Sequence, residues 1–301
     1  MGSIRNTISD IRLCFVVTLF FLISIEGESQ MNFLPKGSRN VTAMSVLDSG
    51  NIKIKYIVNQ YSFQQRNNSL YSKYDSIWYD LCAEDIHILE IGTKLSKYYS
   101  YNIFFGDSIF TDFITKNPYA QSAPNLNIGN PAITNKYFWS DYYKSYVKNT
   151  LTEYAYMPSN IPNYYYSEKM PDFNWKIQND TLRVCGFLCQ KASCTFRGKN
   201  YIAWFARGIP VSDGPWKFCG LPGLILKIYD EHNDYIFECI EIENNKKKFA
   251  ITTYDYSSYK KIEREELLKL WEDIFDHYFQ MVGIDLSNKF KKNPYKPLEL
   301  K

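Results

Sequence analysis

The feature that most constrains the fold is a series of apolar segments in the second half of the chain, several of them joined by very short polar turns. Residues 201–206 read YIAWFA, residues 224–229 read LILKIY, and residues 235–242 follow after a four-residue polar turn. Short apolar runs bounded by turn residues are typical of β-strands. Because connections of a few residues join only antiparallel neighbours, this half of the chain is predicted to be an antiparallel meander.

Other segments extend this prediction. Residues 181–196 form one long strand candidate, followed by a turn at residues 197–200. Residues 201–206 are apolar at every position, which favours a central strand covered on both faces. In the first half, residues 51–59 alternate apolar residues with lysines, which is typical of a strand with one solvent-exposed face. Residues 85–91 and 98–105 are further strand candidates, and residues 117–171, rich in proline and asparagine, are interpreted as long loops with at most one short helix.

A single helix is predicted near the C-terminus. Residues 262–282 repeat large apolar side chains at helical spacing, with acidic residues in the first turns and Gly283 as a stop signal. A helix with such an apolar stripe must cover another element, and one face of the meander is the expected partner. The predicted fold class is therefore mainly β (α+β), a curved antiparallel sheet or half-barrel meander with a C-terminal covering helix.

The N-terminus has the pattern of a secretory signal peptide. Arg5 and Arg12 precede an apolar run over residues 13–25, which is shorter than the roughly 20 residues that span a bilayer. We expect residues 1–29 to be removed by cleavage after Ser29, in preference to an uncleaved anchor. Cys14 lies inside the apolar run, which argues against a lipoprotein. The mature chain is expected to be exported, to the periplasm or to an outer-membrane-associated or extracellular location, without a transmembrane segment.

The mature chain is expected to be a single β-rich domain over residues 30–285, followed by a basic flexible tail over residues 286–301. The tail holds five lysines and one glutamate. It is interpreted as a solvated terminus, with contact to an anionic surface as the alternative. The formal charge of the whole chain is only +3, with basic and acidic residues interspersed, so a nucleic-acid partner is not supported.

Six cysteines remain after signal cleavage. In an exported chain an even number points first to disulfides, although the sequence does not choose among the pairings. The candidate disulfide cysteines are Cys82, Cys185, Cys189, Cys194, Cys219 and Cys239.

Two turn clusters precede the apolar segment at residues 224–229. Pro222 and Gly223 are predicted to form a type II turn, in which the glycine takes a positive φ, and Gly214-Pro215 marks a second tight bend. The two corners fix the rings of Trp216 and Phe218, which we expect to roof the edge of a cavity beside the mixed face of the strand. The candidate site residues are Gly214, Pro215, Trp216, Phe218, Gly220, Leu221, Pro222, Gly223, Leu224 and Ile225.

The block over residues 186–230 resembles the GLPGLI family of exported Bacteroidetes proteins, whose name is the hexapeptide Gly220 to Ile225. Supporting matches are Cys189-Gln190-Lys191-Ala192, Phe196-Arg197-Gly198, Ala203-Trp204-Phe205, Ile209-Pro210, Gly214-Pro215-Trp216-Lys217-Phe218, Leu89-Glu90-Ile91-Gly92 and Ser96-Lys97-Tyr98-Tyr99-Ser100. The chain departs from the family pattern at Ala206-Arg207-Gly208. The resemblance implies export, a β-rich domain and a bacterial envelope setting, and it supplies no activity, cofactor or catalytic residue.

The sequence offers no set of residues typical of a catalytic or metal site. The three histidines, His87, His232 and His277, stand apart, without metal-ligand spacing or a nucleophile motif. In one continuous strand Cys194 projects to the face opposite Cys185 and Cys189, which disfavours a shared metal ion. No catalytic, cofactor-binding or metal residue is therefore predicted.

Two functions are consistent with these features. The first is a non-catalytic envelope protein that binds or carries an apolar small molecule or lipid. The second is an interaction subunit that docks onto an outer-membrane or surface protein complex through the tyrosine-rich region from Tyr137 to Tyr166. A third hypothesis is that the protein is an enzyme of unrecognised type.

Overall fold

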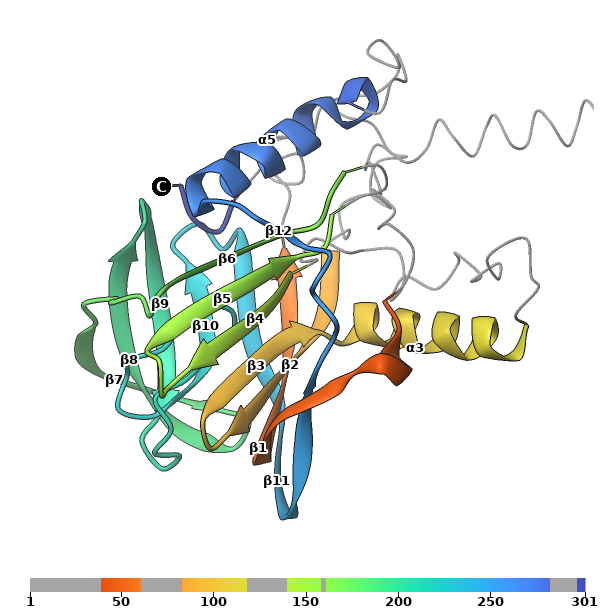
Figure 1. Ribbon diagram of the computed structural model, residues 1–301. Coiled ribbons are helices and arrows are strands. Elements are labelled where there is room, and N and C mark those ends of the chain that lie inside the picture. Colours follow the sequence, from red (N-terminus) through yellow and green to blue (C-terminus); the bar gives the residue numbers. More distant parts are fainter. Residues whose placement is uncertain (1–38, 61–82, 118–139, 158–160, 282–296, 301) are drawn as a thin grey trace, which may run out of the picture.

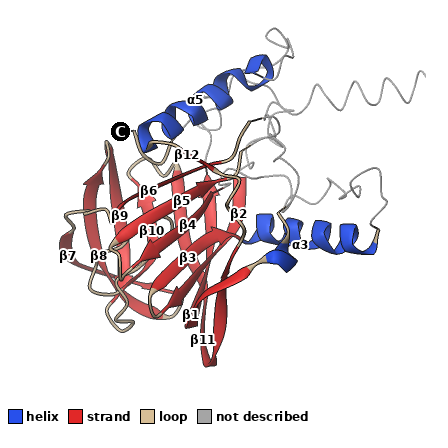
Figure 2. Ribbon diagram, in the orientation of Figure 1, coloured by secondary structure: helices blue, strands red, loops and turns tan. Residues whose placement is uncertain are grey.

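The computed structural model describes residues 39–60, 83–117, 140–157, 161–281 and 297–300. Within them one open, mostly antiparallel sheet of twelve strands curls around a hydrophobic core, and α3 and α5 lie outside it (Figures 1 and 2). The strand order is β12-β6-β5-β4-β3-β2-β1-β11-β10-β9-β8-β7. The elements are η1 (Val41–Ala43), β1 (Ser45–Gln60), β2 (Ala83–Gly92), β3 (Leu95–Ser100), α3 (Tyr101–Lys116), β4 (Ser140–Ser145), β5 (Thr150–Ala155), β6 (Tyr164–Lys169), β7 (Lys176–Val184), β8 (Phe187–Phe196), β9 (Lys199–Ala206), β10 (Leu224–Asp230), β11 (Tyr235–Thr253), β12 (Lys260–Lys261) and α5 (Arg264–Met281).

The predicted mainly β fold and the antiparallel meander are confirmed, with a parallel pair only between β12 and β6. The single long strand predicted over residues 181–196 is wrong. The chain reverses at Cys185 and Gly186, whose φ angles are +48° and +82°, and β7 and β8 form a hairpin. Positive φ at both central residues is the requirement of a two-residue type I′ hairpin turn.

Strand β9 is an interior strand, between β10 and β8, but it is covered fully on one face only. Tyr201, Ala203 and Phe205 are at most 1% exposed, whereas Ile202 and Trp204 on the alternate face are half-buried. The prediction that YIAWFA is covered on both sides is therefore only half right. An apolar run does not tell which of its two faces the rest of the chain will cover.

Two segments of the first half differ from expectation. The strand candidate at residues 98–105 ends at Ser100, where α3 begins, because the Ser100 hydroxyl accepts a hydrogen bond from the Ile103 N–H and caps the helix. The interval interpreted as loops contains β4, β5 and β6, whose tyrosines occupy strand positions. Residues 118–139 and 158–160 of that interval lie outside the described residues.

The predicted C-terminal covering helix is present as α5, but its partner differs. Leu267 and Ile274 pack with Ala155, Met157 and Tyr166 in a second core cluster, so α5 lies over the ends of β5 and β6 rather than over the meander (Figure 1). None of the helices in the described part of the chain is both long and apolar enough to cross a membrane. The expected signal peptide and Cys82 lie outside the described residues.

The final segment is packed, in contrast to the solvated tail that its charge suggested. Leu298 and Glu299 are 7% and 3% exposed, and Leu300 N–H donates to the Arg197 carbonyl at 2.8 Å. Tyr201 also donates to the Leu298 carbonyl. Residues 286–296 and 301 of the expected tail lie outside the described residues.

Candidate functional site

Eight of the ten candidate residues lie in the loop between β9 and β10, and the other two, Leu224 and Ile225, begin β10. All ten are buried except Gly220 and Pro222. The second part of the loop, from residue 213 onward, thus enters the core, whereas residues 207–212 are exposed or partly buried.

The first corner of this loop is centred on Trp216 and Lys217, two residues after the predicted bend at Gly214-Pro215. Phe218 N–H donates to the Pro215 carbonyl at 3.1 Å, and Trp216 has a φ of +51°. A left-handed conformation is costly for a bulky side chain and persists only where surrounding contacts enforce it. The turn that contains this conformation brings Trp216, Lys217 and Phe218 together in the core.

The second corner also differs from the predicted type II turn. The φ of Gly223 is +157°, far from the value near +80° expected at the third position of such a turn. The glycine is required for a different reason: a Cβ at this position would lie 2.4 Å from the Ala206 carbonyl oxygen. Glycine allows β10 to start directly against the end of β9.

The rings of Trp216 and Phe218 are part of the core instead of the roof of a cavity. Phe218 is fully buried and its ring centroid lies 4.8 Å from Tyr201, 5.0 Å from Trp216 and 5.4 Å from Phe173. The concave side of the sheet at this point is filled by the protein's own aromatic side chains. A charged residue at position 218 is therefore expected to disrupt the fold.

Lys144 anchors the start of the loop. Its ammonium group pairs with the Asp213 carboxylate and donates to the carbonyls of Gly214 at 2.7 Å and Phe218 at 3.0 Å. The Tyr146 hydroxyl donates to the second Asp213 oxygen at 2.7 Å. Both charged side chains are 1% exposed. The sequence analysis did not identify Lys144, because nothing in its local pattern distinguishes it from the other strand lysines.

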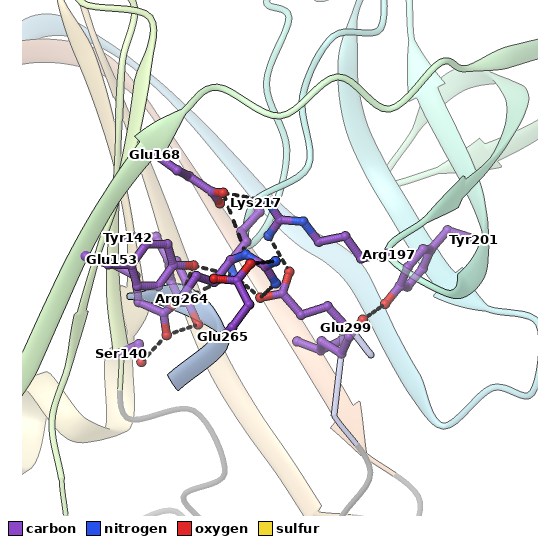
Figure 3. Close-up of polar contacts among 12 residues, drawn as sticks. Ser140, Tyr142, Glu153, Glu168, Arg197, Tyr201, Lys217, Arg264, Glu265 and Glu299 are labelled. Carbon is purple, nitrogen blue, oxygen red and sulfur yellow. Dashed lines mark hydrogen bonds and ion pairs between the residues drawn. The ribbon is translucent and has the colours of Figure 1, made fainter. Parts of the chain in front are cut away.

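Lys217 connects the loop to the opposite part of the sheet (Figure 3). Its ammonium group lies 3.3 Å from Glu153 of β5 and 2.5 Å from Glu299, and it donates to the Tyr166 hydroxyl of β6 at 2.7 Å. The Glu153 carboxylate also accepts hydrogen bonds from Ser140, Tyr142 and Tyr166, at 2.8, 3.2 and 2.9 Å. The buried charges are thus paired and hydrogen-bonded, as burial demands.

Arg197, in the turn between β8 and β9, extends this network. Its guanidinium group contacts Glu299 at 2.6 Å and Glu168 of β6 at 2.5 Å (Figure 3). Burial by itself raises the pKa of Glu299, but the charges of Lys217 and Arg197 outweigh it and hold that pKa below its ordinary value. The network joins β5, β6, the β8–β9 turn and the C-terminal segment.

This network has a structural role: its ion pairs hold distant parts of the fold together. Lys217, Glu153 and Glu299 have side chains 2%, 7% and 3% exposed, and each charged group is saturated by protein partners. Sequence analysis missed all three residues. The available signal was Lys217 itself, a lysine between Trp216 and Phe218 in a motif whose other members are apolar.

The cysteines within the described residues are free thiols, and no pair of them is at disulfide distance. Cys185 is exposed at the β7–β8 turn, so the face argument based on one continuous strand does not apply to it. Cys189, Cys194, Cys219 and Cys239 are buried. Within the described part of the chain, no three His, Cys, Asp or Glu side chains are grouped so as to hold a metal ion.

Part of the tyrosine-rich region is interior. Tyr142, Tyr143, Tyr156 and Tyr166 are between 2% and 6% exposed, and the Tyr142 and Tyr166 hydroxyl groups donate to the Glu153 carboxylate. Tyr154, Tyr164 and Tyr165 are partly buried, and Tyr146 is 40% exposed. The four buried rings are therefore unavailable to a partner, and Tyr137 lies outside the described residues.

Comparison with known proteins gives a short family match. Residues 195–227, which cover β9 and the loop to β10, match a family model described as "Protein of unknown function (Porph_ging)". The match fits a Bacteroidetes-type family of unknown function and does not by itself establish membership of the GLPGLI family. No curated protein matches the chain.

Two solved structures resemble the chain weakly. They are "Structure of PNGF-II in P21 space group", with a TM-score of 0.44 and 14% identity, and "Structure of PNGF-II in C2 space group", with a TM-score of 0.44 and 12% identity. Each match covers 76% of this chain and 34% of the other, so the chain spans about a third of the length of these proteins. At this level of similarity neither structure informs the function.

Proposed function

We propose that this chain is an exported, non-catalytic protein of the cell envelope that docks onto a partner protein through an apolar surface at the β7–β8 hairpin tip. The surface, called the hairpin-tip patch, consists of Leu182, Phe187 and Leu188. This proposal keeps the hypothesis, based on the sequence, that the protein is an interaction subunit. It places the docking surface at the hairpin tip instead of in the tyrosine-rich region.

The observation that carries the proposal is the exposure of these three large apolar side chains. Leu182, Phe187 and Leu188 are 40%, 38% and 60% exposed. Leu182 lies near the end of β7, and Phe187 and Leu188 begin β8 directly after the turn. Exposed apolar residues of this size gathered at one place on a surface are typical of interaction sites.

The composition of the patch favours a protein partner. Arg183 is the only charged residue between Leu182 and Leu188, and the patch combines an aromatic ring with aliphatic side chains. Depletion of charge together with large apolar side chains characterises the centre of protein–protein interfaces. Residues at such a centre carry most of the binding energy.

The alternative hypothesis, that the protein carries an apolar ligand, has less support from the packing of the core. The aromatic rings expected to border a ligand cavity are at most 2% exposed and contact one another. An apolar ligand on this concave side has to displace side chains of the core. Binding of a lipid is therefore an alternative outcome of the experiment below.

A photo-crosslinking residue at position 188, in mature protein expressed in its own cells, tests the proposal. We expect one envelope protein to be cross-linked from position 188 and not from position 147, where Val147 is 75% exposed in a turn between β4 and β5. With that partner purified, Phe187→Ser is expected to weaken binding by roughly tenfold or more while the melting temperature changes little. Equal cross-linking from both positions, or saturable binding of a fluorescent fatty-acyl probe without any protein partner, contradicts the proposal.

A further inference from the structure

The C-terminal segment, residues 297–300, is held by groups that lie far from it in the sequence. The Glu299 carboxylate lies 2.5 Å from the Lys217 ammonium group and 2.6 Å from the Arg197 guanidinium group (Figure 3). The main chain is bonded at two further points, because the Leu298 carbonyl accepts from the Tyr201 hydroxyl and the Leu300 N–H donates to the Arg197 carbonyl at 2.8 Å. One carboxylate and two main-chain groups are thus bound within three consecutive residues.

A leucine lies on each side of this carboxylate. Leu298 is 7% exposed and packs in the main hydrophobic core cluster. Leu300 is more exposed, and its Cβ lies 3.1 Å from the position that a Cβ would occupy on Gly198. Main-chain hydrogen bonds combined with pockets for particular side chains are the way in which proteins recognise extended peptides. The segment is therefore bound as a peptide ligand is bound.

The sheet supplies other carboxylates for the two cations. Lys217 lies 3.3 Å from Glu153 of β5, and Arg197 lies 2.5 Å from Glu168 of β6. Removal of one partner from a buried ion pair is costly when it leaves an uncompensated charge. Without Glu299, Lys217 and Arg197 each keep one carboxylate, and their remaining N–H groups point to the place that Glu299 leaves. The site is thus suited to release one carboxylate and to accept another.

We propose that these residues form a binding site for an extended acidic peptide of a second protein molecule, and that residues 297–300 fill this site within the chain itself. The peptide carries a carboxylate side chain between two large aliphatic residues. The inference goes beyond the proposed function and does not depend on it. Arg197 follows the last residue of β8, whereas the hairpin-tip patch lies around the start of β8, so the two sites are at opposite ends of that strand.

The chain's own segment competes with any other peptide. A ligand joined to its site by the same chain has a high effective concentration, so a separate peptide binds with a reduced apparent affinity. Weakening the contacts of residues 297–300 is therefore expected to increase the affinity for a peptide added in solution. A segment with only a structural role has no such effect on peptide binding.

The test uses the full mature chain with Leu298→Ser and Glu299→Gln, which weaken the segment and leave Lys217, Arg197 and Tyr201 in place. A fluorescently labelled peptide with the sequence of residues 295–301, YKPLELK, is titrated with protein, and its anisotropy is measured. We expect saturable one-to-one binding, at least tenfold tighter than to the parental protein. The same peptide with glutamine in place of glutamate is expected to bind at least tenfold more weakly.

Matched variants control for the site. Arg197→Gln, added to the same background, is expected to weaken peptide binding tenfold or more. Arg183→Gln, at an exposed position of the β7–β8 hairpin, leaves the binding unchanged. If the double variant fails to fold, parental protein is titrated at higher concentration, where weaker but saturable binding that unlabelled peptide displaces is expected. Absence of saturable binding to the folded proteins, or equal binding of the glutamate and glutamine peptides, overturns the inference.

Sedimentation velocity of the double variant mixed with parental protein identifies the source of the peptide. A one-to-one complex shows that the segment of a second copy enters the site. Peptide binding without such a complex supports the site equally and assigns its ligand to a different protein.

Discussion

Lys144 of β4 and Asp213 of the β9–β10 loop form an ion pair from which solvent is almost fully excluded, with each side chain 1% exposed. The same ammonium group donates to two carbonyls of the loop, those of Gly214 and Phe218. All of its hydrogen-bonding capacity is thus directed at one segment. The pair fixes the start of the loop that fills the core.

Lys144→Met is expected to destabilise the protein by about 3 to 5 kcal/mol, because it leaves the Asp213 carboxylate buried without a counter-charge. Chemical denaturation of the variant measures this loss. Lys55→Met removes an exposed partner of Glu241 and serves as the control, with an expected loss below about 1 kcal/mol. Equal losses in the two variants are incompatible with a special role for Lys144. Adding Asp213→Asn to Lys144→Met is expected to recover part of the loss.

Glu299 makes the stability depend on acid pH. Its pKa in the folded protein is lower than the value of about 4.5 that it has in an unfolded chain. Its contribution to stability is therefore fully present above pH about 4.5 and is lost as the pH falls through the folded-state pKa. We expect Glu299→Gln to lower the melting temperature at neutral pH and to flatten its decrease on acidification. Glu266→Gln, at an exposed position of α5, is the control and leaves the profile nearly unchanged. An unaltered profile in Glu299→Gln contradicts this prediction.

Gly223→Ala is expected to cost about 1 to 3 kcal/mol of stability, because the added methyl group overlaps the Ala206 carbonyl and the backbone conformation is unfavourable for other residues. Thermal unfolding compares it with Gly208→Ala. Position 208 has no atom within 4 Å of an added Cβ, so that control should unfold within about 0.5 kcal/mol of the parent protein. A tolerated alanine at position 223 shows that the close approach of β9 and β10 is not required.

Phe218→Ala is expected to cost about 3 to 5 kcal/mol, because the ring is fully buried among Phe173, Tyr201 and Trp216. Phe187→Ala, at a ring 38% exposed, should cost much less. Denaturant titration of both variants measures the difference. If Phe218→Ala retains full stability and only binding of an apolar probe changes, the ring belongs to a ligand site rather than to the core.

Export is tested by the intact mass of the native protein isolated from the cell envelope. The mass is expected to correspond to a chain that begins at Gln30, within a few positions, because the apolar run at residues 13–25 is followed by small residues at Gly27 and Ser29. Protein that retains Met1 in the envelope fraction contradicts the prediction of a cleaved signal peptide.

The sequence alone determined the local elements of the second half. The apolar run at residues 201–206 follows a short turn at residues 197–200, and the runs at residues 224–229 and 235–242 flank another at residues 231–234; such connections allow only antiparallel neighbours, and the 3.6-residue repeat at residues 262–282 allows only a helix. The prediction from the sequence failed where local signals conflict. At Tyr101 residues with strand propensity continue into a helix that Ser100 caps, and Cys185 reverses the chain without a conventional turn sequence.

Only the tertiary structure decided what lies in the core. Lys217 meets Glu299 across 82 positions of sequence, and Lys144 meets Asp213 across 69, because the sheet curls until the loop and the C-terminal segment lie between its distant strands. Such contacts depend on the twist and curvature of the whole sheet, which no local pattern encodes. For the same reason the sequence identified Trp216 and Phe218 but not their environment: a pair of rings between two tight corners is equally consistent with a cavity wall and with a filled core, and the partners that fill it come from strands remote in the chain.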